Sequence, residues 1–167
     1  MALFAGRTLS HVRSWRTGLS LWEASVTTGH VGPRGWYNLA LMRLDADHTD
    51  GAREATETAI ALGLDEPQCQ ALIAMAAFNG GDPAESERVA RAALDRWPDH
   101  PELLQIVGVN LAQRGAWREL EALCEKPLER EPAQPVVWNL LAQARRNLGN
   151  RSGAQEALRR AQELSHP

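Results

Sequence analysis

The stretch WNLLAQARRNLG, residues 138–149, repeats a pattern already present in WYNLALMRLDAD, residues 36–47. In both, a tryptophan precedes a Leu-Ala pair by three residues, and a short polar turn follows. The two tryptophans, Trp36 and Trp138, are 102 residues apart. A pattern that recurs in this way indicates internal repeats, and the period of those repeats determines the expected fold.

Prolines mark the period, because Pro33, Pro67, Pro101 and Pro135 are each separated by 34 residues. When the four segments are aligned, equivalent positions carry residues of similar kind. The eighth, fifteenth and twenty-seventh positions hold, in turn, Ala40, Ala74, Gly108 and Ala142; Asp47, Gly81, Gly115 and Gly149; and Ala59, Ala93, Pro127 and Ala161. Trp36 and Trp138 both occupy the fourth position, three periods apart.

Each unit is predicted to form two helices. Proline at the first helical position is tolerated because its missing N–H would have no partner there. Glycine at the turn accepts the left-handed conformation that ends a first helix, and small residues at the eighth and twenty-seventh positions allow close helix packing. The predicted first helices (A) span 33–46, 67–80, 101–114 and 135–148, and the second helices (B) span 50–63, 83–96, 117–130 and 151–164. The B helices are expected to begin near Asp50, Asp82, Ala116 and Asn150, of which the three polar residues are good N-caps.

This pattern resembles the tetratricopeptide repeat family over residues 33–167. The resemblance implies an all-α fold, a right-handed α-solenoid of antiparallel helix pairs with a 34-residue period. The whole chain, 1–167, is then a single repeat domain with units 33–66, 67–100, 101–134 and 135–167. Residues 1–32 keep the same phase and are interpreted as a partial repeat or capping helices, with a lone helix at 15–28 as the alternative.

Three departures from the family pattern affect local geometry. The usual aromatic at the eleventh position is replaced by Arg43, Ala77, Leu111 and Arg145. Pro127 lies inside the third B helix and is expected to shorten or kink it. Asp47 replaces the turn glycine of the first unit.

Composition excludes several functional classes. A net charge of −3 without a long run of either sign gives no basic surface for nucleic acid. No stretch approaches the roughly 20 apolar residues of a membrane span, so we expect a soluble chain with no direct membrane insertion. The N-terminal MALFAG is too short for a signal peptide. Two cysteines, Cys69 and Cys124, make neither a disulfide framework nor a metal site.

The candidate catalytic and metal sites are weak. The acidic stretch from Asp45 to Gly51 has Asp50 at its sixth place, where a calcium loop needs glycine, so it is interpreted as a turn whose Asp50 caps a helix. The five histidines lack partners at ligand or triad spacing. Cys124 is expected to be a buried small hydrophobe. The sequence therefore predicts no catalytic residues, no metal and no cofactor.

Binding is instead expected on the face formed by the A helices, the concave face of such arrays. Amides both donate and accept hydrogen bonds, which suits an extended peptide. The predicted groove residues are Arg34, Tyr37, Leu41, Gln68, Met75, Phe78, Asn79, Gln105, Gln113, Asn139, Gln143, Arg146 and Asn147. The same positions also place Ala71 and Val109 outward. An alternative is that Leu41, Met75 and Phe78 only pack against neighbouring helices.

The family also contains members that grip C-terminal carboxylates with Lys and Asn on the A helices. Tyr37 and Leu41 stand where that clamp would begin, so binding of this kind is not expected.

Three functional hypotheses follow. The first is a non-catalytic module that binds a peptide or protein segment. The second arises because WRTGLSLWEASVTTGHVGPRGWYNLA, residues 15–40, resembles the junction before the repeat-bearing tail of bacterial multi-span glycosyltransferase-type membrane proteins. The chain would then be a regulatory or scaffolding tail, tethered to a membrane through its parent protein. The third is self-association through the C-terminal helix, whose outer face holds Ala154, Ala157, Leu158, Ala161 and Leu164. Against the third, the charged residues of the same helix can make it polar enough to remain solvated. The sequence leaves the cellular compartment open.

Overall fold

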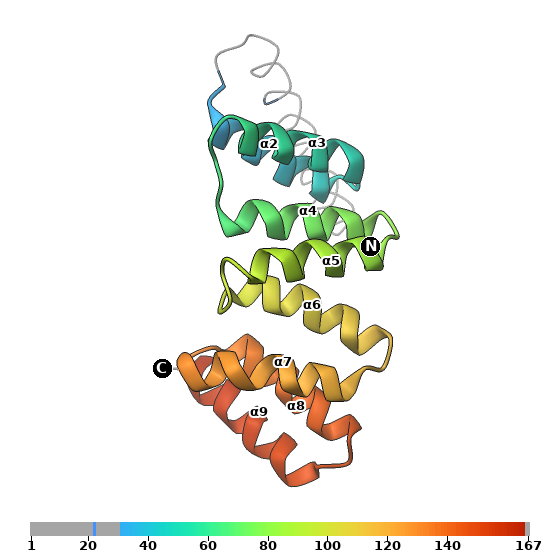
Figure 1. The fold of residues 1–167 in the computed structure, drawn as a ribbon, viewed down its shortest axis with the longest axis vertical. Helices are drawn as coiled ribbons and strands as arrows, with labels where there is room; N and C mark the ends of the chain where they lie inside the picture. Colours follow the sequence, from blue (N-terminus) through green and yellow to red (C-terminus); the bar gives the residue numbers. More distant parts are fainter. Residues whose placement is uncertain (1–21, 23–30, 166–167) are drawn as a thin grey trace, which may run out of the picture. The chain divides into compact units, whose positions relative to one another are not determined.

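The computed structural model describes Trp22 and residues 31–165, and every regular element from residue 31 to residue 165 is an α-helix. Figure 1 shows these helices in chain order, labelled α2 to α9. The helices are α2 (Pro33–Asp45), α3 (Thr49–Ala61), α4 (Pro67–Asn79), α5 (Pro83–Leu94), α6 (Pro101–Gln113), α7 (Trp117–Arg130), α8 (Pro135–Asn147) and α9 (Arg151–Ser165). The predicted fold class, an all-α solenoid of helix pairs, is confirmed.

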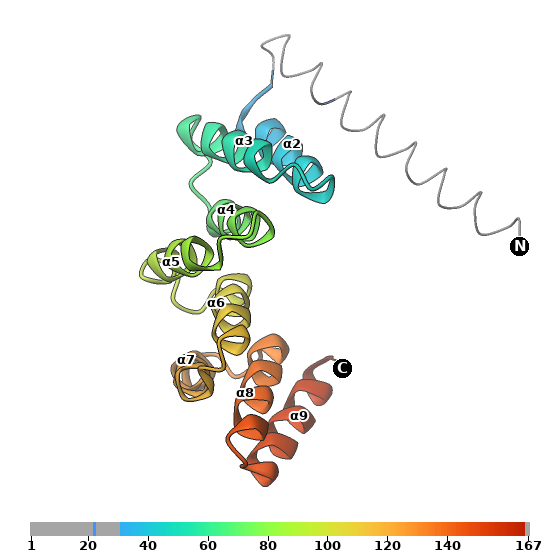
Figure 2. The same ribbon diagram turned by 90° about the vertical axis from the view of Figure 1, so that its right-hand side faces the viewer.

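The chain divides into two compact units, Met1–Gly81 and Asp82–Pro167. Unit 1 contains α2, α3 and α4, and unit 2 contains α5 to α9. Within each unit, helices that are consecutive in the chain pack against each other, and α8 and α9 lie side by side in both views (Figures 1 and 2). The A helices α2 and α4 are in contact in unit 1, and α6 and α8 are in contact in unit 2.

The prolines set where the A helices begin. Pro33, Pro67, Pro101 and Pro135 are each the first residue of a helix, as predicted, and each of these helices has 13 residues. Since proline has no N–H to leave unpaired and its φ is already helical, the same residue repeats the same start.

The turn inside each pair has a left-handed residue at its centre. Gly81, Gly115 and Gly149 have φ of 86°, 71° and 83°, and Asp47 has φ of 58°. The predicted left-handed turn is thus confirmed in all four pairs, and Asp47 adopts it at a steric cost that the glycines avoid.

Replacing Asp47 by glycine is expected to raise the free energy of unfolding by about 0.5–1 kcal/mol, because glycine takes φ of 58° without a clash. Urea unfolding followed by circular dichroism measures the change. The matched control is Asp45→Gly at the last residue of α2, where glycine weakens a helix. Stabilisation by both changes would show that the left-handed conformation at residue 47 is not the cause.

The caps of the B helices agree with prediction in two places. The Asp82 carboxylate accepts a hydrogen bond of 2.9 Å from the Glu85 N–H, and Asn150 Oδ1 accepts one of 2.9 Å from the Gly153 N–H. The prediction for Asp50 is wrong, because α3 begins at Thr49 after His48 as the N-cap. All four turns have three residues, so the position equivalent to Asp82 is His48.

Pro127 does not shorten its helix. The third B helix, α7, continues to Arg130 with Pro127 buried inside it, so the predicted shortening is wrong. The missing N–H removes one hydrogen bond of the helix, to the carbonyl of Leu123. Burial of the proline ring together with Leu128 in the same turn offsets that loss.

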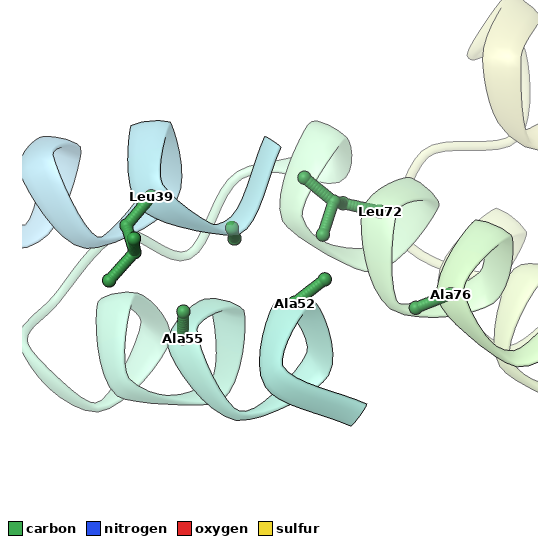
Figure 3. Close-up of a cluster of buried hydrophobic side chains, with 6 residues drawn as sticks. Leu39, Ala52, Ala55, Leu72 and Ala76 are labelled. Atoms are coloured by element: carbon green, nitrogen blue, oxygen red, sulfur yellow. The ribbon is translucent and has the colours of Figure 1, made fainter. Parts of the chain in front are cut away.

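The core of unit 1 is small. Figure 3 shows Leu39 of α2 above Ala55 of α3, with Leu72 and Ala76 of α4 beside Ala52. These five side chains are at most 2% exposed. Because most of them are alanines, the helix backbones approach closely and two leucines fill the remaining space.

In unit 2, Gly108 serves the same purpose on α6. A Cβ atom added at Gly108 would lie 2.8 Å from Cδ1 of Leu140 and 3.2 Å from Cδ1 of Leu120. Leu140 belongs to α8 and Leu120 to α7, so glycine allows three helices to meet. The predicted role of a small residue at the eighth position is confirmed here.

Candidate functional site

The predicted groove residues form two surfaces, one in each unit. The A-helix face of unit 1 comprises Arg34, Tyr37 and Leu41 of α2 with Gln68, Met75, Phe78 and Asn79 of α4. The A-helix face of unit 2 comprises Gln105 and Gln113 of α6 with Asn139, Gln143, Arg146 and Asn147 of α8. All of them are exposed or half-buried, whereas Ala71, predicted to face outward, is fully buried between helices.

The face of unit 1 is mainly apolar, and part of it supports the core. Tyr37 and Met75 are half-buried and pack against the cluster of Leu39 and Leu72. The packing alternative therefore holds for Met75. Leu41 is 37% exposed, and Arg34 is held by a 2.7 Å ion pair with Glu66. Leu41 is consequently the apolar side chain that this face presents most fully to a partner.

The face of unit 2 is rich in amides. Gln105, Gln113, Asn139 and Asn147 are exposed, and Gln143 is half-buried. Asn147 Nδ2 donates to the Gln143 carbonyl at 2.8 Å, which leaves its oxygen free to accept. Val109 lies on the same side of α6 and is 37% exposed. Exposed amide groups, which both donate and accept, therefore lie on the same helices as one exposed apolar side chain.

The sequence did not reveal a hollow on the other side of unit 2. A groove of about 810 Å³ lies between α5 and α7, with the buried side chain of Leu104 from α6 among its lining. The lining includes the small side chain of Ala92 on α5 and that of Ala122 on α7. Pro127 of α7 also lines the groove. The small residues on these B helices are a signal in the sequence, but only the helix spacing shows that they border a hollow.

Cys69 and Cys124 are both buried, and they do not form a disulfide bond. Cys69 Sγ lies 3.3 Å from the Leu64 carbonyl, to which it donates, and burial raises the pKa of its thiol. Burial also raises the pKa of the Cys124 thiol to about 12. Neither thiol therefore has the thiolate character that nucleophilic chemistry needs, which supports the structural role predicted for Cys124.

The high pKa of Cys124 predicts a pH dependence of stability. The unfolded thiol ionises from about pH 9, and the folded one only near pH 12. Its contribution is complete below pH 9 and is lost as the pH rises from 9 to 12. Urea unfolding of the wild type and of Cys124→Ala at pH 8, 9.5 and 11 should show a difference in stability that shrinks with pH. A constant difference would contradict the burial argument.

The described helices show neither a metal-binding group nor a membrane span. Within residues 31–165, no three histidine, cysteine or acidic side chains come together as a metal-binding group. None of the helices from α2 to α9 combines the length and the apolar character needed to cross a bilayer.

One part of the sequence matches a known protein family. Residues 135–165, which form α8 and α9, match the model of the tetratricopeptide repeat family. This segment of the chain is a tetratricopeptide repeat. The stretch predicted to resemble a glycosyltransferase-type junction, residues 15–40, lies largely outside the described residues. So does the partial repeat predicted for residues 1–32, of which Trp22, Val31 and Gly32 are described.

Solved structures of other proteins share the fold of this chain. MamA superposes with a TM-score of 0.72 at 13% identity over 99% of this chain and 95% of MamA. TTC0263 from Thermus thermophilus has a TM-score of 0.69 at 20% identity, covering 98% of this chain and 89% of its own. YrrB, described as a tetratricopeptide repeat protein with an unusual peptide-binding site, has a TM-score of 0.62 at 16% identity, with coverage of 95% and 81%. No curated protein matched the sequence.

Proposed function

We propose that this chain is a non-catalytic module that binds a peptide or protein segment on its A-helix faces. The amide-rich face of unit 2 is the observation that carries the proposal. Four glutamine or asparagine side chains are exposed on two helices, α6 and α8, that contact each other. An extended segment presents main-chain N–H and C=O groups at short intervals, and amides satisfy both kinds.

The face of unit 1 supplies apolar contacts to the same class of ligand. Leu41 offers its exposed side chain, and half-buried Phe78 lies on the neighbouring helix α4. Apolar anchors usually carry more of the binding free energy than surrounding polar contacts, which confer orientation. YrrB, whose fold this chain shares, is described as having a peptide-binding site, which adds support from a protein of the same architecture.

The test is capture of partners from soluble and membrane fractions of the source cell with the wild-type chain and two variants. One variant carries Asn139→Ala with Arg146→Ala on unit 2, and the other carries Leu41→Ala with Asn79→Ala on unit 1. Loss of two contacts, both polar in the unit 2 variant and one apolar in the unit 1 variant, should weaken binding about ten-fold or more. Leu62→Ala, at a side chain 51% exposed beyond α3, is the matched control and should bind as the wild type does.

Partners that bind the two A-helix-face variants as well as they bind the wild type would contradict the proposal. The groove between α5 and α7 would then become the place of interaction, and Ala122→Glu on its wall would be the next variant. Partners found in the membrane fraction would favour the hypothesis of a tail on a membrane enzyme.

Self-association is a second candidate, favoured by two leucines on α9. Ala154, Ala157 and Ala161, predicted to lie on the same uncovered face, are buried, so the prediction is wrong for these three residues. Leu158 is 42% exposed and Leu164 is 38% exposed. Arg159 lies between them and is paired with Glu156 at 2.7 Å, so the charges near these leucines are already neutralised. Sedimentation at increasing concentration should show a rising mass that Leu158→Glu abolishes. A constant monomer mass would exclude this candidate.

A further inference from the structure

Asn79 is the last residue of α4, and the two residues that follow it, Gly80 and Gly81, lie in the turn at the end of unit 1. The chain has six asparagines, and Asn79 is the one that precedes a glycine. Leucine follows Asn38, Asn110, Asn139 and Asn147, and arginine follows Asn150. An asparagine before glycine is chemically distinct, because glycine has no Cβ atom to obstruct its own amide nitrogen.

The amide nitrogen of Gly80 can attack the carboxamide of Asn79. The Gly80 N–H loses its proton to hydroxide, and a bond forms between the nitrogen and Cγ of Asn79. The Cγ–Nδ2 bond breaks, and the side-chain nitrogen takes a proton from water and leaves as ammonia. Water then opens the resulting succinimide ring, giving aspartate when the new N–Cγ bond breaks and isoaspartate when the original peptide bond breaks. The overall reaction consumes water and releases ammonia, with no oxidant, reductant or cofactor.

Solvent can reach the groups that react. The Asn79 side chain and Gly80 are both exposed. Gly81 has φ of 86°, and a Cβ atom added there would meet none of the described atoms within 4 Å. Hydroxide and water, which the reaction takes from solution, can therefore approach this turn.

Backbone hydrogen bonds restrain the same turn. The Gly80 N–H donates to the Ala76 carbonyl at 2.9 Å, and the Gly81 N–H donates to the Phe78 carbonyl at 3.1 Å. Gly80 has φ of −72° and ψ of −1°, so the helical turn continues through it. The Gly80 nitrogen must leave the Ala76 carbonyl before it can lose its proton and move toward Cγ of Asn79. The folded turn therefore opposes the reaction that its sequence favours.

We propose that Asn79 is a site of spontaneous deamidation, and that opening of the last turn of α4 controls the rate. Helix ends open more readily than helix centres, so the reactive state is accessible without global unfolding. The product places a carboxylate at the C-terminal end of α4, where the helix dipole is already negative, and so disfavours reclosure of the turn. It also adds a negative charge to the A-helix face of unit 1. The proposal is independent of segment binding.

The test is incubation of the full chain in mildly alkaline buffer, folded and in guanidinium chloride, followed by tryptic mapping with mass spectrometry. The tryptic peptide 54–88 contains Asn79 as its only asparagine, and enzymatic methylation detects isoaspartate in it. Asn79 should react faster than the other five asparagines in guanidinium chloride. In the folded chain its reaction should be slower by about ten-fold or more, because the turn is closed for most of the time.

Hydrogen exchange of the Gly80 amide provides an independent measure of the opening. Exchange and deamidation both remove the same N–H proton, so both proceed from the opened turn. The factor by which folding slows deamidation should therefore follow the factor by which folding slows exchange of the Gly80 N–H. Equal deamidation rates in the folded and unfolded chains, or a folded-state rate unrelated to Gly80 exchange, would overturn the proposed control by the helix end.

Two variants test the role of the glycine. Gly80→Ala should slow the reaction at Asn79 even in guanidinium chloride, since the added Cβ obstructs the nitrogen. Leu148→Gly creates the same dipeptide at Asn147, the last residue of α8, and should make Asn147 reactive; wild-type Asn147 is the matched control. Leu148 is 39% exposed, so its removal leaves the core of unit 2 in place.

The site itself is overturned if Asn79 reacts no faster than Asn147 in the unfolded wild type, or if Gly80→Ala reacts like the wild type. Should Leu148→Gly fail to fold by circular dichroism, its Asn147 must still react in guanidinium chloride, where folding has no influence. An unreactive Asn147 in that experiment overturns the proposal that the following glycine creates the site.

Discussion

Replacing Leu72 by alanine is expected to lower the free energy of unfolding by about 2–5 kcal/mol. Leu72 is fully buried in unit 1, where its neighbours include Ala40, Ala52 and Ala76. Alanine side chains have no atoms with which to fill the space that the leucine vacates. The cavity therefore persists, and the cost lies toward the upper part of the range.

Urea unfolding followed by circular dichroism measures this loss. Leu62→Ala is the matched control, because the same three carbons are removed from a side chain that is 51% exposed. A change within about 0.5 kcal/mol is expected there. Equal effects at the two leucines would mean that Leu72 is not the centre of the cluster of unit 1.

Replacing Gly108 by leucine is the second large effect, with an expected loss of about 3 kcal/mol. Even a single Cβ at this position would lie 2.8 Å from Leu140 Cδ1, and a full leucine side chain has no space between α6 and α8. The helices must move apart, and the contacts of Leu120 and Leu140 with α6 are then lost together.

Gly108→Ala separates the steric effect from helix propensity. Alanine gains about 1 kcal/mol of helix propensity over glycine, while the contacted atoms are the ends of leucine side chains that shift at small cost. We expect a net change below about 1 kcal/mol. If Gly108→Leu also left the free energy of unfolding nearly unchanged, α6 and α8 could not pack as closely as described.

The sequence predicted the helices well because two residue types act locally. Proline marks each A-helix start through its fixed φ, and the left-handed residue of each turn, such as Gly115, marks where the pair reverses. Both effects depend on one or two residues of backbone and need no tertiary information. The N-cap predicted for α3 was wrong because Asp50 has the better capping side chain, whereas the cap lies at His48, 34 residues before the cap residue Asp82.

The surfaces were less predictable, because they depend on how helices face one another. Ala71 sits at an outward position by helix counting and yet is fully buried. A smaller cavity beside Asn110 and the groove beside Leu104 depend on the spacing between neighbouring helices, which a period of 34 residues does not encode. The signals in the sequence were an asparagine at a position where two other units have alanine, and the small residues on the B helices beside the groove.

The small-residue core has a thermodynamic consequence. Fourteen of the 31 buried hydrophobic residues among those described are alanines, so each ordered residue removes little apolar surface from water. Unfolding then exposes less such surface than in an ordinary domain, and the heat-capacity change falls below the usual value of about 12–15 cal/mol/K per residue. A small heat-capacity change flattens the dependence of stability on temperature. The same alanines that bring the helices together should therefore make the protein's stability change less between cold and warm conditions than that of a domain with a larger-residue core.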